Sequence, residues 1–150
     1  MRMITTGLLE AGAAATLIAA YAAEMRPMLH GAAIPQAEDA VLLLDGALLL
    51  GAFDAGAPVG FLLLLDLPEI VFARRCGQVE DLFILPSHRR RGAARALLGA
   101  AMAEARARNF SHLRWFVPER DVAAIALYET IAERAGWRGF ILPLDTDASL

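Results

Sequence analysis

The sequence predicts a mixed α+β fold, in which a mainly antiparallel sheet is flanked by helices. Three apolar runs, at residues 47–53, 59–65 and 79–85, have the length and composition of strands. Short links join them, which is typical of an antiparallel meander. Helical patterns stand before and after this meander. The expected order is therefore β-α-α-β-β-β-α-β-α-β, in a single domain over residues 1–150.

A short strand and two helices are expected before the meander. Residues 3–6 predict a short strand. Leu8 to Met25 has amphipathic helix character and ends before Pro27, which cannot continue a helix. The stretch 36–44 begins with carboxylates and continues with apolar residues, an order that suits the positive end of a helix dipole.

Turn residues separate the strands of the meander. Asp54–Pro58 has the composition of a hairpin turn between the first two strands. Residues 68–77 connect the second strand to the third, which Pro86 ends. The clearest helix follows at Gly92 to Arg108, because its apolar residues recur at intervals of three and four.

The last third of the chain predicts three further elements. Residues 112–117 alternate as a strand does. Asp121 can cap a helix over 122–135, and residues 137–143 form the last expected strand.

The composition favours a globular protein that binds a small anion. The chain is 57% hydrophobic, 21% charged and carries a net charge of −3, which argues against binding nucleic acid or an anionic membrane. Yet ten of the fourteen arginines lie between Arg74 and Arg120, and lysine is absent. A locally basic middle in an acidic chain suggests a small anionic ligand. The alternative is that these arginines are merely solvated.

Two features bear on the compartment and on metals. Cys76 is the only cysteine, so an intramolecular disulfide is excluded, and we expect neither a cysteine-based metal site nor a metal cofactor. The apolar run at residues 11–23 loosely imitates a signal peptide, but Glu10 interrupts its entry. We therefore expect a cytoplasmic protein.

The segment from Val79 to Leu98 predicts an anion site. A strand, Pro86, a basic turn and an alanine-rich helix follow one another there. Free backbone N–H groups and the helix dipole converge at such a helix start. Gly92 allows a ligand to approach the backbone closely, and the small Ala93 and Ala94 leave the amides uncovered.

This segment resembles the GNAT superfamily of N-acetyltransferases. Their acetyl-CoA loop has the pattern Arg/Gln-x-x-Gly-x-Gly/Ala after a strand ending in an apolar-x-Pro element. Here the strand ends in Ile84-Leu85-Pro86 and the loop reads Arg89-Arg90-Arg91-Gly92-Ala93-Ala94. Asp121 and Ala124 precede Tyr128 where such proteins often have Asn-x-x-Ala-x-x-x-Tyr. In motif, the chain is most similar to diamine acetyltransferases and their bacterial relatives.

The resemblance implies acetyl-CoA as the cosubstrate. Amides of the loop would hold its pyrophosphate, the main chain of the preceding strand would bind the pantetheine arm, and Tyr128 would protonate the leaving thiolate. The implied cofactor-binding residues are Leu82, Phe83, Ile84, Arg89, Arg90, Arg91, Gly92, Ala93, Ala94, Arg95, Asp121 and Ala124. Asp121 stands where the family usually has Asn. An alternative for Tyr128 is that it is a core aromatic.

Acyl transfer to an amine needs a neutral nucleophile, because an ammonium has no lone pair, and a carboxylate on the strand can accept its proton directly or through water. Glu80 is the predicted base, since strict alternation places it on one face with Leu82 and Ile84, and Asp81 on the other. A bulge in the strand would blur this assignment. Alternatively, Glu80 and Asp81 only bind a cationic substrate or pair with an arginine. His30, in the loop between the first two helices, could line the substrate pocket.

The predicted function is acetyl-CoA-dependent N-acetylation of a primary amine on a small cationic acceptor, by direct transfer in a ternary complex. The alternative is a non-catalytic module that binds CoA or acyl-CoA on the same fold, which Asp121 in place of Asn favours. We expect no nucleic-acid or membrane partner. A homodimer is compatible with the apolar composition.

Overall fold

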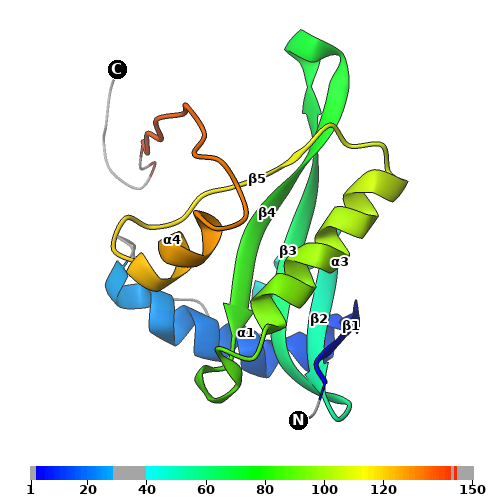
Figure 1. Cartoon of the computed structure of the whole chain (residues 1–150), viewed down its shortest axis with the longest axis vertical. Helices are drawn as coiled ribbons and strands as arrows, with labels where there is room; N and C mark the ends of the chain where they lie inside the picture. The colour runs from blue at the N-terminus through cyan, green and yellow to red at the C-terminus, as the bar shows by residue number, and fades with distance from the viewer. Residues whose placement is uncertain (1–2, 29–39, 143, 145–150) are drawn as a thin grey trace. The chain divides into compact units, whose positions relative to one another are not determined.

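The computed structural model describes residues 3–28, 40–142 and 144. The chain forms two compact units, Met1–Pro118 and Glu119–Leu150. Among its described residues, the first contains a five-stranded sheet in the order β1-β2-β3-β4-β5 and the long helices α1 and α3 (Figure 1). The strands are β1 (Thr5–Leu8), β2 (Leu48–Asp54), β3 (Ala57–Glu69), β4 (Arg74–Ile84) and β5 (Leu113–Trp115), and the helices are α1 (Ala11–Met25) and α3 (Ala93–Ala107).

The sheet is antiparallel from β1 to β4, and β5 joins β4 in parallel. A mixed, mainly antiparallel sheet flanked by helices is thus confirmed. β3 and β4 form the longest pairing, from Gly60 opposite Ile84 to Glu69 opposite Arg74. A short 3₁₀ turn, η3 (Ile70–Phe72), joins them. The hairpin is longer than predicted because residues 68–77 extend both strands instead of forming a loop.

A β-bulge interrupts the pairing of β3 with β4. Leu63 lies opposite Asp81, whereas Leu64 lies opposite Val79, so Glu80 is the extra residue on β4. A bulge breaks the strict alternation of side chains between the two faces of a strand. The face assignment of every residue before Glu80 therefore differs from the one that alternation along β4 predicts.

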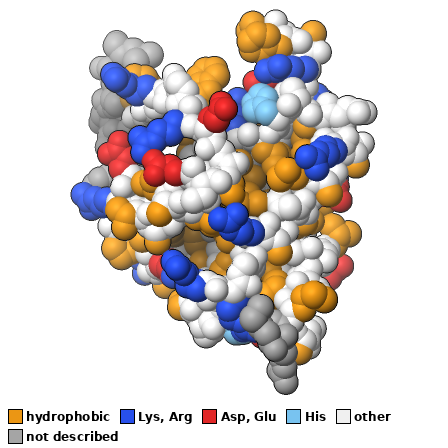
Figure 2. Space-filling view, in the orientation of Figure 1, with side chains coloured by type: hydrophobic (Ala, Val, Ile, Leu, Met, Phe, Trp, Pro, Cys, Tyr) orange, Lys and Arg blue, Asp and Glu red, His pale blue; other side chains and the backbone are white. Residues whose placement is uncertain are grey.

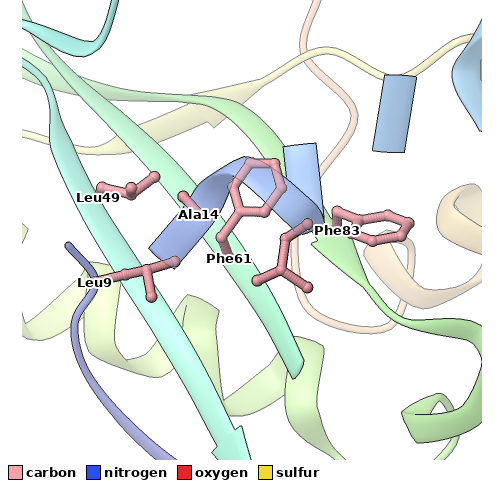
Figure 3. Packing of buried hydrophobic residues seen from close by; sticks show 6 residues of the cluster. Leu9, Ala14, Leu49, Phe61 and Phe83 are labelled. Carbon is pink, nitrogen blue, oxygen red and sulfur yellow. The ribbon is translucent and has the colours of Figure 1, made fainter. Parts of the chain in front are cut away.

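One face of the sheet packs against α1. Phe61 and Phe83, opposite each other on β3 and β4, meet Ala14 and Leu17 of the helix (Figure 3). The Tyr21 ring approaches Phe61 edge-on, with centroids 5.6 Å apart at 84°. Small alanines on α1 let the helix lie close to the aromatic rings.

The other face packs against α3, which Figure 1 shows across the sheet from α1. Leu62 follows Phe61 on β3 and points to this second face, where it is fully buried. The buried residues of α3 recur at helical intervals, as predicted: Ala93, Leu97, Leu98, Ala101 and Ala105. This packing fixes the start of α3 next to the end of β4.

Gly60 marks a close approach between β3 and the end of β4. A Cβ at this position would lie 2.6 Å from the Phe83 carbonyl oxygen and 2.4 Å from Cδ1 of Ile84. Both distances are far below van der Waals contact, so this point of the sheet has room only for glycine.

The second unit contains α4 (Val122–Tyr128), which is shorter than the helix predicted over 122–135. The Asp121 carboxylate caps it, as predicted, by accepting a hydrogen bond of 3.1 Å from the Ala124 amide. The strand expected over 137–143 is wrong for residues 137–142, which form no strand. Residue 143 lies outside the described part.

Several expectations meet the structure near the N-terminus. The first strand forms at Thr5–Leu8 instead of 3–6, and α1 begins at Ala11 instead of Leu8. Most of the helix predicted over 36–44 lies outside the described residues, as does His30. The end of this predicted helix forms a 3₁₀ turn, η2 (Leu42–Leu44).

Among the described residues, no helix has the length and apolar character needed to span a membrane. The single domain over 1–150 stays a prediction.

Candidate active site

The turn between β4 and α3 has the backbone of an anion site. Gly92 is the N-cap of α3 and takes the left-handed conformation, with φ 80° and ψ 3°. The first hydrogen bond of the helix runs from the Ala96 amide to the Gly92 carbonyl, at 2.9 Å. The amides of Gly92, Ala93 and Ala94 precede this bond, at the positive end of the helix dipole. They are therefore placed to donate to an anion.

The open space beside Gly92 is also consistent with an anion site. A Cβ added there would meet nothing within 4 Å, so the approach to the turn is open. A left-handed φ also disfavours any residue with a side chain. Arg90 likewise has a positive φ of 61° and is exposed. The turn is thus shaped by its backbone and leaves room for a ligand beside Gly92.

Arg89 faces inward to the protein rather than to this space. Its Nε donates to the Ile84 carbonyl at 2.9 Å, and its Nη2 donates to Oε2 of Glu24 on α1 at 2.6 Å. Its guanidinium also lies 5.7 Å from the centre of the Phe83 ring. Arg89 therefore ties the turn to the end of β4 and to α1.

Arg91 and His88 both reach Asp54, the last residue of β2. Arg91 Nη1 donates to Asp54 Oδ2 at 3.1 Å, and His88 Nε2 lies 3.4 Å from the same oxygen. The other carboxylate oxygen, Oδ1, is buried without a hydrogen-bond partner in the described part of the chain. Asp54 thus ties the β2–β3 hairpin to the basic turn. Of the three consecutive arginines, Arg89 and Arg91 are engaged in ties of this kind.

The end of β4 offers backbone groups beside this turn. On one side Leu82, Phe83 and Ile84 pair with β3. On the other side β5 pairs with β4 only at Gly77–Val79. Within the described part of the first unit, the second edge of residues 80–84 therefore has no strand partner. Such an edge can hydrogen-bond to an extended ligand as a further strand would.

The two carboxylates of β4 lie at the bulge and differ in environment. Glu80 is exposed, and its Oε2 accepts a hydrogen bond of 2.7 Å from Gln78 Nε2. By their pairing, Gln78 and Leu82 face opposite sides of the sheet. The prediction that Glu80 shares a face with Leu82 and Ile84 is therefore wrong, because it assumed alternation without a bulge.

Asp81 is half-buried on the face that packs against α1. Burial raises the pKa of its carboxyl group, the hydrogen bond from Tyr21 opposes this, and the nearby Glu80 charge raises it further. Asp81 thus holds a proton more readily than an ordinary aspartate. Sequence reasoning missed Tyr21 and Asp54 as neighbours of the site, since both lie far away in the chain and no spacing signals their approach.

In the second unit, Tyr128 is the last residue of α4. Burial raises the pKa of its hydroxyl, and the Asp121 carboxylate raises it further. Tyr128 is therefore protonated at neutral pH, as a proton donor must be. The resemblance connects Asp121 and Ala124 with the cofactor. In this structure the hydrogen bond between them caps α4.

Comparisons with known proteins agree with this geometry. A sequence model of the acetyltransferase (GNAT) family matches residues 14–132, and the chain belongs to this family. A search of curated protein sequences found no match. The family uses acetyl-CoA as its cosubstrate.

Three solved structures illustrate the similarity. The ribosomal-protein-alanine N-acetyltransferase from Brucella melitensis biovar Abortus 2308 is 32% identical, with a TM-score of 0.81, covering 95% of this chain and 99% of that one. An aminoglycoside acetyltransferase from an uncultured soil metagenomic sample is 25% identical, with a TM-score of 0.77 and coverages of 95% and 99%. A transcriptional regulator from Bacillus halodurans C-125 shares the fold at 16% identity, with a TM-score of 0.80 and coverages of 95% and 100%.

Proposed function

We propose that this acetyltransferase moves the acetyl group of acetyl-CoA to a primary amine, by direct transfer within a ternary complex. The observation that carries the proposal is the left-handed Gly92 turn beside a strand edge without a partner. Together they suit a pyrophosphate and the extended amide arm attached to it.

The residues that would hold the cosubstrate follow from these groups. The amides of residues 90–95 would donate to the pyrophosphate, with most of the contact made by the backbone around Gly92. The main chain of residues 82–84 would pair with the pantetheine arm. Arg90 would add a charge-assisted bond from its exposed position, whereas Arg89 and Arg91 would act by holding the turn in shape.

Proton transfer would need two side chains, a base for the amine and an acid for the leaving thiolate. Acetyl-CoA supplies an activated acetyl thioester. Glu80 is the proposed base, because it is exposed to an incoming amine and can take its proton directly or through water. Asp81 is the competing base, since its raised pKa brings it closer to the working pH. Tyr128 is the proposed acid that returns a proton to the leaving thiolate.

The proposed acceptor is a small cationic amine, as in diamine acetyltransferases. The two adjacent carboxylates at the bulge support a cationic acceptor, because they would attract its second charged group. Similarity to an aminoglycoside acetyltransferase, at 25% identity, points to the same class of acceptor.

A second candidate acceptor is the N-terminal α-amine of a protein. The 32% identity to a ribosomal-protein-alanine N-acetyltransferase over nearly the whole of both chains favours it. Such an acceptor presents a peptide rather than a second amine.

One experiment tests these proposals together. Release of the CoA thiol from acetyl-CoA is followed with polyamines, amino acids, aminoglycosides and peptides that begin with alanine. Turnover with one amine class and not the others identifies the acceptor. If CoA binds but no amine supports turnover, the enzyme proposal fails and the non-catalytic CoA-binding module replaces it.

A further inference from the structure

Three side chains with metal-ligating atoms meet at the end of the sheet where β4 begins. Glu69 is the last residue of β3, Cys76 lies near the start of β4, and His112 immediately precedes β5. A carboxylate oxygen, the thiol sulfur and a ring nitrogen from these residues all lie within 4.8 Å of one another. The Gly77 amide donates to the His112 carbonyl at 3.0 Å, which holds the two strands together beside the cluster.

The surroundings of His112 direct its Nε2 toward this cluster. Ser111 Oγ lies 2.8 Å from His112 Nδ1 and donates its only hydrogen to the Arg75 carbonyl at 3.2 Å. When the hydroxyl accepts from Nδ1–H in return, the neutral ring keeps its lone pair on Nε2. This is the tautomer of a histidine that binds a metal through Nε2, with a hydrogen bond to the other nitrogen fixing the ring.

Nε2 of His112 lies 3.7 Å from Oε1 of Glu69. In this tautomer both atoms carry lone pairs, and the distance is too long for a hydrogen bond between them. It is close to the separation of about 3.4 Å between two ligands of a tetrahedral zinc ion, given metal–ligand bonds of about 2.0–2.2 Å. A cation between the two atoms would satisfy both.

Glu69 is held so that one oxygen faces the cluster. Arg74 Nε donates to Oε2 at 2.6 Å, which leaves Oε1 for a metal. Arg114 Nη1 lies 3.9 Å from Oε1, and its Nε donates to Gln78 Oε1 at 3.1 Å. Arg114 therefore competes with a cation at this oxygen while keeping a second partner of its own.

We propose that Glu69, Cys76 and His112 bind one Zn²⁺ ion, with water as the fourth ligand. One sulfur, one nitrogen and one oxygen donor suit zinc better than magnesium or calcium, which prefer oxygen alone. On binding, the Cys76 thiol would release its proton to solvent as the Zn–S bond forms. This proposal departs from the sequence-based expectation of no cysteine-based metal site, because two of the three ligands come from outside β4, the strand that carries Cys76.

The proposed zinc site lies far from the candidate active site, so its role would be structural. Cys76 and Ile84 are eight positions apart on β4, which is about 26 Å of extended strand. The zinc would join β3, β4 and the start of β5 below the tip of the β3–β4 hairpin. Figure 2 shows hydrophobic side chains at this tip and histidine and arginine side chains on the surface just below it.

The test uses the full chain, freed of any polyhistidine tag and of metal. Titration with zinc against a chromogenic chelator should give one ion per chain, and cobalt should give the sulfur-to-cobalt charge-transfer band of a Co–S bond. His112→Gln should weaken zinc binding by more than about 100-fold, since it removes a ligand rather than an outer hydrogen bond. Ser111→Ala should weaken it by about tenfold, because only the hold on the ring is lost.

Two further variants serve as controls. His88 also has a serine hydroxyl beside its Nδ1, at 2.9 Å, but its Nε2 faces Asp54; His88→Gln should leave zinc binding unchanged. Arg114→Gln should tighten binding, because it removes the competing cation. Because Cys76 is fully buried, Cys76→Ser could unfold the chain, and His112→Gln, at a half-exposed residue, carries the test. Absence of one-to-one binding, or equal loss in His88→Gln and His112→Gln, overturns the proposal.

Discussion

At the scale of single residues, Asp81 differs most from what its sequence neighbours suggest. Its pKa is raised above the ordinary value of 3.8, mainly by burial. A raised pKa in the folded protein means that stability is complete below the ordinary value and is lost as pH rises through the folded value. Asp81→Asn, which keeps an acceptor for Tyr21, should therefore stabilise the protein near pH 7. Urea unfolding near pH 7 and near pH 3 checks this, and the gain should vanish at the lower pH.

Variants of Glu80 and Asp81 distinguish which of the two carboxylates accepts the proton of the amine. If Glu80 is the base, Glu80→Gln lowers kcat/KM by about 10²- to 10⁴-fold, and Asp81→Asn does not. If Asp81→Asn instead removes the acidic limb of the pH–rate profile, the base is Asp81. The paired variants are matched in size and in loss of charge, so the comparison isolates the role of each carboxylate.

Tyr128 has a hydroxyl whose proposed task is to give up a proton. Tyr128→Phe should lower kcat by about 100-fold and leave binding of CoA unchanged, because only the acid is lost. Steady-state kinetics and calorimetric titration with CoA measure the two effects. An equal loss in binding and in kcat would show that Tyr128 supports the fold of α4 instead.

The side-chain roles at the basic turn were beyond the reach of the sequence. The sequence Gly92-Ala93-Ala94 did predict the start of α3, because a helix start depends on the residues at that point of the chain. Arg89 and Arg91, in contrast, turn toward Glu24 and Asp54, which are distant in the chain. Only the folded sheet brings those carboxylates near, so no spacing could have distinguished these arginines from Arg90.

At the scale of elements, two arginines of the turn between β4 and α3 hold it in shape, and the third faces solvent. Arg89→Ala removes the donor to the Ile84 carbonyl and the ion pair with Glu24, and should destabilise the protein by about 1–2 kcal/mol. Arg90→Ala should leave stability within about 0.5 kcal/mol and raise KM for acetyl-CoA. Denaturant unfolding and initial-rate kinetics give both numbers. The reverse pattern would contradict the proposed division.

The strands show where elements could and could not be predicted. The meander and α3 follow from local periodicity, and β2 and α3 were predicted close to their true bounds. The β3–β4 hairpin extends to Glu69 and Arg74 because an ion pair and a long pairing continue past Pro68, which interrupts the apolar pattern. The bulge at Glu80 is a property of two strands together, so one strand's sequence does not reveal it. Trp137–Leu142 has strand-like composition but finds no pairing in the described residues.

At the scale of the whole molecule, binding of CoA should stabilise the folded state. A ligand at 100 times its dissociation constant contributes about 2.7 kcal/mol. For a chain of 150 residues this raises Tm by about 5–10 °C. Differential scanning fluorimetry with and without CoA measures the shift, and Gly92→Ala should reduce it. No shift at saturating CoA would contradict the cofactor proposal, whichever acceptor is used. The homodimer stays a prediction that light scattering can test.

The close approach at Gly60 has a consequence for sequence diversity. If position 60 were randomised and active clones were selected, we expect glycine alone to survive, because any Cβ would strike the Phe83 carbonyl and Ile84. Gly99, on the exposed side of α3, has open space around it, and alanine there should raise stability by about 1 kcal/mol. Deep sequencing of both libraries would contrast a fixed position with a freely variable one. Gly60 would thus be fixed by the close packing of β3 against the end of β4, without touching any ligand itself.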